Sequence, residues 1–351
     1  MPGLLTIKNI IIMKNLKYLP YAAFLVLAAV SYSCSDDDGG GGNRGGGGNG
    51  GGGAATSGSG MPTTAELGVE WPMSRVDNYS GEFLNFDYDS DGRLTGGYDG
   101  SFGGNFTIET SPLAIEYRDT DPSYDNRHSV TDIKVNEDGY IVSAKVTETW
   151  DEPSDPSENW SVDGTIELEY NADGRVTQVV ERCNMKEYDY ESSFVVYNTF
   201  TWQDGRIAMH VYSYTEDGQY YTEKGEERRE YSYEDSYANT GVYADLDGLE
   251  TIYTSLWYSG LFGKAPAQLP SSYVASKYED GQPVGSPWSG SKDVTYYSDG
   301  RVRTYENYYT FHYYDAPAVT DSTAVHKAAG TDRKHGAKAV VERLRAHRAA
   351  R

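Results

Sequence analysis

The chain has 351 residues, and its 53 Asp and Glu outnumber its 30 Lys and Arg, which gives a formal net charge of −23. The excess lies in residues 34–320, where 50 acidic residues face 19 basic ones. Such a surface repels phosphate groups, so we expect no nucleic acid partner. There are only two cysteines, Cys34 and Cys183. If one of them is modified, a disulfide framework is excluded.

Residues 1–33 are typical of a signal peptide. We expect Met13 to be the true start, because Lys14 and Lys17 follow it as a basic region and residues 21–30 form a short apolar region. That apolar region is shorter than the roughly 20 residues of a membrane-spanning helix. The segment therefore predicts export from the cytoplasm.

The segment Ser31-Tyr32-Ser33-Cys34 resembles a lipobox, the site at which bacterial lipoproteins are cleaved and acylated. It departs from the usual pattern, since Leu is commoner than Ser at the third position before Cys. The acidic residues 36–38 that follow resemble the surface-export signal of Bacteroidota lipoproteins. We predict Cys34 as the lipid attachment site, in a protein anchored in the outer membrane and exposed at the cell surface. The alternative is an ordinary signal peptide that is cleaved elsewhere.

The composition then divides the chain into three parts. Residues 34–60 predict a flexible tether after the lipidated cysteine, since residues 39–60 contain 14 Gly. Residues 61–320 are expected to fold. Residues 321–351 hold eight Lys and Arg but only three acids, and we predict a basic, disordered tail. Docking of this tail on the acidic domain and binding to anionic lipid are the alternatives.

Period-two alternation marks the folded part as a β-sheet. In residues 165–170, Ile166 and Leu168 face one side of a strand, and Glu167 and Glu169 face the other. An Asp-Gly pair then precedes the next strand, as expected for a tight turn closed by a left-handed Gly. Cys183 is expected to be a buried or half-buried residue of that strand.

The same Asp-Gly unit recurs at uneven spacing, which indicates successive hairpins. We therefore predict an all-β fold, an antiparallel meander of hairpins that forms a strongly curved sheet or open barrel and is soluble. A short helix is expected within residues 239–262, where the alternation breaks down. The five units are residues 88–95, 135–141, 170–177, 202–207 and 296–302.

Aromatic residues are frequent in the strands, as in the expected final strand with Tyr305, Tyr309, Phe311 and Tyr313 on one face. Such rings stabilise a sheet by packing across strands. A continuous tyrosine-lined face could instead bind sugar rings. We favour the packing role, because Tyr is a preferred strand residue.

Several segments together resemble a Bacteroidota lipoprotein family of unknown function, domain-of-unknown-function family 4595. They are Tyr231-Ser232-Tyr233-Glu234, residues 260–266, Leu269-Pro270 and Asp299-Gly300-Arg301. The resemblance covers residues 80–315 approximately. It implies a porin-like β fold, but no activity and no catalytic residues. We do not interpret this fold as a pore, because Glu167 and Glu169 occupy the face that would meet lipid.

Motifs for chemistry are weak. Residues 87–92 match the start of a calcium-binding EF-hand loop, but position twelve is Tyr98 in place of Glu, so we predict a turn with an incidental calcium site as the alternative. None of His128, His210 and His312 lies at a metal-binding spacing. We therefore predict no catalytic residue, no cofactor and no metal site.

The sequence favours a non-enzymatic binding or accessory module for a glycan or surface protein. The alternative is a structural envelope lipoprotein without a small ligand. A glycosidase that uses a carboxylate pair such as Asp151-Glu152 is a third hypothesis. An open aromatic groove would favour binding, a filled interior would favour the structural role, and acids or His converging in a cleft would favour the enzyme.

Overall fold

The computed structural model describes residues 61–313, apart from 122, 152, 155, 157–158, 188–189, 219–220, 235–236, 244–252 and 307. The predicted signal peptide, Cys34, the tether and residues 321–351 lie outside the described residues. In the part described, the strands are β1 Met73–Asn78, β2 Gly81–Tyr88, β3 Leu94–Asp99, β4 Gly104–Thr110, β5 Leu113–Asp119, β6 Arg127–Val135, β7 Ile141–Trp150, β8 Trp160–Tyr170, β9 Val176–Glu187, β10 Tyr190–Gln203, β11 Arg206–Gly218, β12 Tyr221–Ser232, β13 Ser272–Glu279, β14 Gln282–Ser291, β15 Val294–Tyr296, β16 Val302–Tyr305 and β17 Tyr309–Tyr313.

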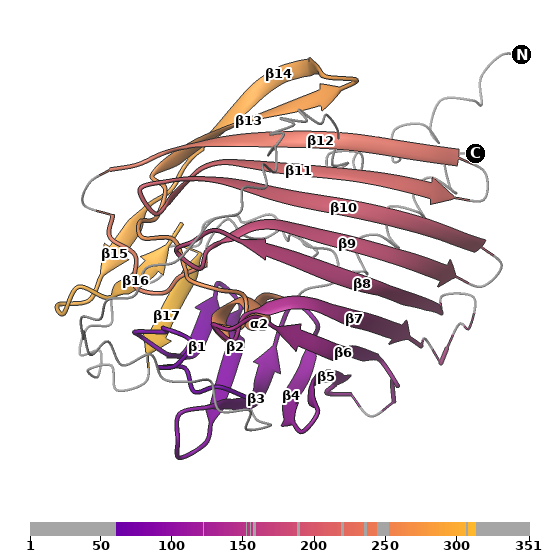
Figure 1. Cartoon of the computed structure of the whole chain (residues 1–351), viewed down its shortest axis with the longest axis horizontal. Coiled ribbons are helices and arrows are strands. Elements are labelled where there is room, and N and C mark those ends of the chain that lie inside the picture. The colour runs from indigo at the N-terminus through magenta and orange to yellow at the C-terminus, as the bar shows by residue number, and fades with distance from the viewer. Residues whose placement is uncertain are drawn as a thin grey trace, which may run out of the picture.

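All 17 of these strands belong to one antiparallel sheet (Figure 1). Each strand pairs with its neighbour in sequence, except that no ladder is described between β14 and β15. The last strand returns to the first, with Val76 of β1 opposite Phe311 of β17. The sheet therefore curves back on itself and stays open between β14 and β15. This confirms the predicted antiparallel meander and strongly curved sheet.

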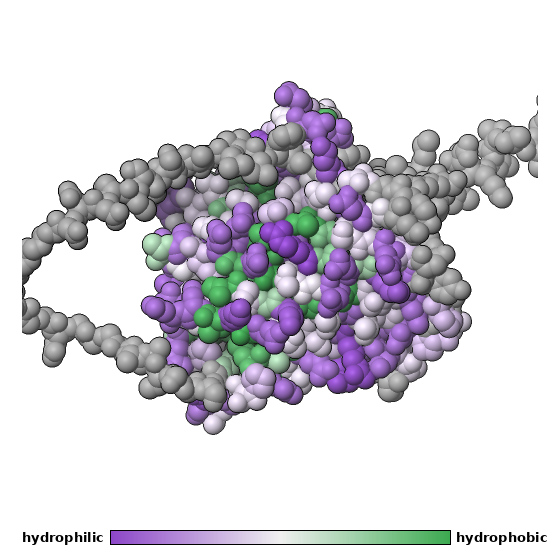
Figure 2. Space-filling model, turned by 45° about the vertical axis from the view of Figure 1, so that its right-hand side comes forward, coloured by the Kyte–Doolittle hydropathy of each residue, from purple (hydrophilic) through white to green (hydrophobic). Residues whose placement is uncertain are grey.

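The inner face of the sheet carries the core. In β8, Ile166 and Leu168 are buried, whereas Glu167 and Glu169 are exposed, as the alternation predicted. Cys183 of β9 is buried on the same inner face, which confirms its predicted place. In the view of Figure 2, hydrophobic side chains gather in a central area bordered by hydrophilic ones. No helix of the described residues is long and apolar enough to cross a bilayer.

The Asp-Gly units are turns, as predicted. Between β8 and β9, the amide of Asn171 donates to the carbonyl of Arg175 at 2.9 Å, and the amide of Gly174 donates to the carbonyl of Asn171 at 3.0 Å. The side-chain oxygen of Asn171 accepts from the amides of Asp173 and Arg175. Gly174 has φ +79°, a left-handed conformation that favours glycine because it has no Cβ.

The same pattern recurs between β2 and β3 and between β6 and β7, with Asp89 and Asn136 in the place of Asn171. Because consecutive strands run antiparallel, the turns β2–β3, β6–β7, β8–β9 and β10–β11 lie at one end of the sheet, here called the turn end. The same local sequence pattern thus forms these turns along the turn end of the sheet.

A segment without strands, residues 253–269, packs against the turn end and is here called the cap segment. The amide of Lys264 donates to the carbonyl of Gly174 at 2.8 Å, and the amide of Ala267 donates to the carbonyl of Gly205 at 2.8 Å. The carbonyl of Leu261 accepts from the amide of Ile141 at 2.8 Å. The first two bonds satisfy turn carbonyls and the third satisfies the amide of Ile141, all of which would otherwise need water.

The cap segment begins with the short helix α2, Thr254–Tyr258, which confirms the helix expected within residues 239–262. Leu256 and Trp257 of α2 are buried, as are Leu261 and Phe262 that follow. Trp257 contacts Phe262 with ring centroids 5.1 Å apart. Figure 1 shows α2 within the curve of the sheet. The cap segment therefore supplies core residues as well as backbone bonds.

Candidate functional site

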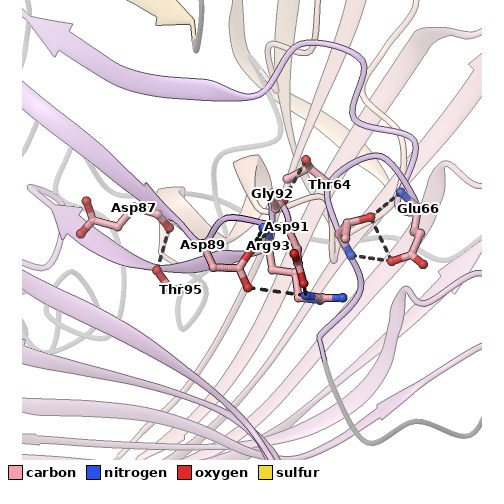
Figure 3. Close-up of polar contacts among 9 residues, drawn as sticks. Thr64, Glu66, Asp87, Asp89, Asp91, Gly92, Arg93 and Thr95 are labelled. Carbon is pink, nitrogen blue, oxygen red and sulfur yellow. Dashed lines mark hydrogen bonds and ion pairs between the residues drawn. The ribbon is translucent and has the colours of Figure 1, made fainter.

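The loop that begins like an EF-hand is a turn between β2 and β3 (Figure 3). One carboxylate oxygen of Asp89 accepts from the amides of Asp91 and Arg93, both at 2.9 Å. The guanidinium of Arg93 binds the carboxylate of Asp91. Figure 3 shows the side chain of Asp87 apart from these two, and its carbonyl accepts from the Thr95 hydroxyl at 3.0 Å. The predicted turn is confirmed, and the carboxylates of Asp89 and Asp91 serve the turn itself.

The three histidines of the folded part lie at separate places. Nε2 of His312 lies 2.8 Å from Oδ2 of Asp77, and Nε2 of His210 lies 2.8 Å from Oδ1 of Asn198. Within the ranges described, no three His, Cys, Asp or Glu side chains are close enough together to hold a metal ion. The structure therefore offers no group that fits a metal cofactor there.

A buried polar network lies where the cap segment meets β6 and β7. Nδ1 of His128 lies 2.9 Å from Oε2 of Glu148. The hydroxyl of Tyr253 donates to the other carboxylate oxygen of Glu148 at 2.7 Å. The rings of His128 and Tyr253 meet edge to face, with centroids 4.8 Å apart. These three residues join β6, β7 and the residue before α2.

The network continues on the other side of α2. The hydroxyls of Tyr117 and Ser255 are 2.8 Å apart, and the amide of Ser255 donates to Oδ2 of Asp99 at 2.8 Å. Burial raises the pKa of the Tyr117 hydroxyl well above its usual value, and the charge of Asp99 adds to this. Burial, followed by the charge of Glu148, raises the pKa of Tyr253 in the same way. Both hydroxyls therefore stay protonated at neutral pH.

This network brings a His and two acids together, but not in a cleft. His128, Tyr117 and Asp99 are each 0% exposed, and Glu148 is 2% exposed. A reactant has no path to such groups, so their arrangement holds the cap segment in place. Sequence reasoning missed the network, because its members come from separate strands and the cap segment. The available signal was a His and a Glu at inner-face positions of β6 and β7.

The predicted single final strand is wrong, because Tyr305 ends β16 and pairs with Tyr309 at the start of β17. The aromatic residues of these two strands nevertheless belong to the core. Tyr305, Phe311 and Tyr313 are buried, and Tyr309 is partly buried against them. Tyr258 of α2 packs on Phe311 with ring centroids 6.4 Å apart. The predicted packing role is confirmed, and this face does not serve as a surface for sugar rings.

An open hollow of about 570 Å³ lies on the outer face of β6 to β9. Its volume is within the ~300–1,000 Å³ of small-molecule sites. Hydroxyl, amide and charged groups of both signs converge there. The side chain of Trp160 is only 5% exposed and shares the inner face of β8 with Val162. Trp160 itself lies parallel to Trp150, with centroids 6.0 Å apart. The lining residues are Asp125, Arg127, Ser129, Thr147, Thr149, Asp151, Asn159, Trp160, Ser161 and Lys186.

The charges in this hollow are partly paired. Arg127 binds Asp125 at 2.7 Å, whereas Lys186 binds Glu191 at 2.9 Å, outside the lining. Asp151, one of the two acids considered for a glycosidase, lines the hollow, and Glu152 lies outside the described residues. The other predicted site residue, Cys34, also lies outside them.

A second hollow of about 530 Å³ lies on the outer face of β2 to β4. Gly96 and Gly97 form part of its lining. A Cβ at Gly97 would lie 1.9 Å from the carbonyl oxygen of Asn85, so glycine is required for the strands to approach here. The acids Glu82 and Asp87 also line it.

Comparison with known proteins gives little. No family model matches the chain, so its membership of the lipoprotein family that it resembles is not supported. No curated protein matches either. Among solved structures, the chain is similar to a porin-like protein from Bacteroides vulgatus ATCC 8482, with 11% identity, a TM-score of 0.46, and coverage of 70% of this chain and 100% of that one. A similarity at this level carries no information about function.

Proposed function

We propose that this protein is an outer-membrane lipoprotein, anchored through Cys34 and exposed at the cell surface, that binds a glycan without catalysis. The observation that carries the proposal is the open polar hollow on β6 to β9. The anchor rests on the lipobox-like sequence before Cys34 and the acidic residues 36–38 after it.

The lining of the hollow matches the chemistry of a carbohydrate. Sugar hydroxyls both donate and accept hydrogen bonds, and the hollow offers hydroxyls from Thr147 and Thr149, an amide from Asn159 and a carboxylate from Asp151. Thr147 and Thr149 belong to β7, whose ladders fix them, and Asp151 and Asn159 lie directly beside the ends of β7 and β8, so little ordering is needed on binding.

A glycan binding screen on the full chain, followed by calorimetry on the best ligand, tests this proposal. The double variant Thr147→Val/Thr149→Val replaces two hydroxyls with methyl groups of the same shape. We expect affinity to fall about tenfold or more, since each lost hydrogen bond is worth about 1 kcal/mol. The matched control is Thr201→Val/Thr215→Val, two exposed strand threonines outside the hollow. Equal losses in both variants would place the glycan elsewhere.

The anchor has its own test. Cys34→Ala should abolish acylation, because the lipid is attached to the thiol, and mass spectrometry of the mature amino terminus measures this. An unmodified terminus at a residue other than Cys34 in the parent would contradict the proposal.

Replacing residues 36–38 by Ala should reduce protease accessibility on intact cells while total protein stays constant.

One observation favours a structural envelope lipoprotein as the second candidate. The described interior is filled by aromatic rings and the cap segment, with no open aromatic groove. A screen in which neither glycans nor surface proteins bind the full chain would favour this second function.

A further inference from the structure

The two hollows on the outer face lie on one line of residues that crosses the strands. In the hollow on β2 to β4, Asn85 pairs with Tyr98, and Tyr98 pairs with Asn105. Asn105 then pairs with Arg118 of β5, and Arg118 pairs with Arg127 of β6, which lines the other hollow. Along this line, only β5 therefore separates the two hollows.

The line continues through the hollow on β6 to β9. Arg127 pairs with Thr149, Thr149 pairs with Ser161, and Ser161 pairs with Lys186. We call these paired residues, from Asn85 on β2 to Lys186 on β9, the outer row. Because adjacent strands lie about 4.8 Å apart, the outer row is roughly 34 Å long. A linear chain of sugars has the length to follow this row, whereas a single sugar covers only a small part of it.

The side chains of the outer row are accessible. Every one of them is exposed or half-buried. In the described part of the chain, several of its amides and hydroxyls make no hydrogen bond, namely those of Asn85, Asn105, Thr149 and Ser161. Such groups both donate and accept, as the hydroxyls of a sugar do. The row therefore offers polar groups in both hollows to one ligand.

Tyr98 and Arg118 extend this chemistry to the middle of the row. Burial, followed by the charge of Asp99, raises the pKa of the Tyr98 hydroxyl, which therefore remains a donor at neutral pH. Tyrosine combines this donor with an apolar ring, which suits the apolar face and the hydroxyls of a sugar. The side chain of Arg118 is 53% exposed and binds Glu116 at 2.6 Å. A guanidinium has five N–H donors, so others remain for a ligand between the hollows.

The charges around the row favour an uncharged ligand. Glu82 and Asp87 line the first hollow, and Asp125 and Asp151 line the second. The basic residues of the outer row are paired with neighbouring acids. A chain with many negative charges is repelled by the lining acids. A neutral chain meets no such barrier.

The outer row lies toward the end of the sheet opposite the turn end. Thr149 and Ser161, for example, flank the connection between β7 and β8. The described chain begins at Met61, and the amide of Thr64 donates to the carbonyl of Gly92 in the β2–β3 turn at 3.1 Å. The folded domain therefore begins at the turn end, and the row lies away from the point where the predicted tether joins it.

We propose that the two hollows are parts of one binding track for a linear, neutral oligosaccharide that lies along the outer row, across the strands. This inference rests on the proposed function and adds to it the class of glycan, its direction on the sheet and a contribution from β2 to β4. The strand spacing is close to the length of one sugar ring in such a chain, so successive sugars meet successive strands. Arg118 connects the two hollows at the middle of the track.

Calorimetry on the full chain tests the track through chain length. The probes are fragments of xylan, mannan and amylose, each as a disaccharide and as a chain of about eight sugars, one for each strand from β2 to β9. We expect one long chain per protein molecule, bound at least about tenfold more tightly than the disaccharide, since it forms more hydrogen bonds. Two long chains per protein molecule, or equal affinities for both lengths, would overturn the proposal. A glycan screen that finds a ligand while none of these fragments binds would also overturn it, and would leave the proposed function standing.

A variant of the first hollow separates one track from a single site on β6 to β9. Asn85→Ala/Asn105→Ala removes two amides, so affinity for the long chain should fall about tenfold or more while affinity for the disaccharide stays unchanged. The control Gln203→Ala/Gln282→Ala removes two exposed amides outside both hollows and should change neither affinity. Long-chain binding that weakens in the threonine variant of the β6–β9 hollow, but not in the asparagine variant, would retain the proposed function and overturn the track.

Discussion

The two halves of the sheet bury carboxylates in different ways. On β3 to β7, Asp99 and Glu148 receive hydrogen bonds from Ser255 and Tyr253 of the cap segment. On β9 and β11, Glu181, Glu187 and Glu216 are buried at inner-face positions of the long strands themselves. The first half teaches that a curved sheet tolerates inner-face acids where a second piece of chain supplies the donors.

Strand length separates the halves as well. β3 has 6 residues and β10 has 14, although both strands belong to the same antiparallel meander. The long strands β8 to β11 share their turn end with β2–β3, so their additional residues extend the opposite end of the sheet. Glu187 and Glu216 lie near that opposite end, where the cap segment makes no described hydrogen bond. The first half is thus closed by its own cap, and the second presents a longer inner face.

The largest effect is expected from removing Glu148. Glu148→Ala leaves Nδ1 of His128 and the hydroxyl of Tyr253 without their acceptor in the interior. We expect the free energy of unfolding to fall by about 3–5 kcal/mol, the cost of breaking one side of a buried pair. Denaturant unfolding measures it. Glu167→Ala, exposed on β8, is the control and should change stability by less than about 0.5 kcal/mol. A small change at Glu148 would mean that the cap is not held by this network.

The next effect concerns the turn end. Gly174→Val forces a left-handed residue to carry a branched side chain, and its Cβ would lie 2.9 Å from the ring of Tyr140. We expect a loss of about 1–3 kcal/mol from backbone strain, with the collision adding to it. Thermal unfolding measures the change.

The matched control for this change is Gly300→Val. Gly300 also ends an Asp-Gly turn, with φ +88°, but a Cβ there meets nothing within 4 Å. Its loss therefore reports strain alone, and the difference between the two variants reports packing at the capped end. Equal melting temperatures for Gly174→Val and the parent would contradict the turn geometry.

Local patterns made these turns and strands predictable, whereas the polar sites were not. The positive φ of Gly174 follows from an Asp-Gly pair between two alternating strands, which is information within a few residues. The pairing of β1 with β17 joins Val76 to Phe311, and no local pattern specifies such a contact. The His128 network has the same difficulty, since Ser255 bonds to Asp99 from a distant part of the chain. Alternation shows which residues face inward but not which of them meet.

A smaller effect is expected at Tyr253. Tyr253→Phe keeps the ring packing on His128 but removes the donor to Glu148. One carboxylate oxygen then loses its partner, so we expect a loss of about 1–3 kcal/mol, below that of Glu148→Ala. The double variant with Glu148→Ala should cost less than the sum of the two single changes, because the two groups share one bond. Additive losses in denaturant unfolding would show that they act independently.

The smallest effect tests the seam between β1 and β17, where Asp77 lies 2.8 Å from His312. Burial raises the pKa of Asp77, but hydrogen bonds from Arg75 and His312 outweigh it and leave the pKa below its usual value. A lowered pKa in the folded state means that the ionised form stabilises the fold above the unfolded pKa of about 3.9. That stability is lost as pH falls through the lowered pKa. Because Asp77 is partly exposed, Asp77→Asn should cost only about 0.5 kcal/mol at pH 7.

The pH dependence of this cost separates pairing from packing. The difference between the parent and Asp77→Asn should persist from neutral pH to about pH 4 and shrink below it, as the aspartate of the parent becomes neutral. Asp163→Asn, at an exposed position of β8, makes the same charge change away from the seam and is the control. A cost at Asp77 that stays constant at low pH would show that the seam depends on the shape of the side chain. In that case β17 would be held to β1 by its ladder and by Phe311 alone.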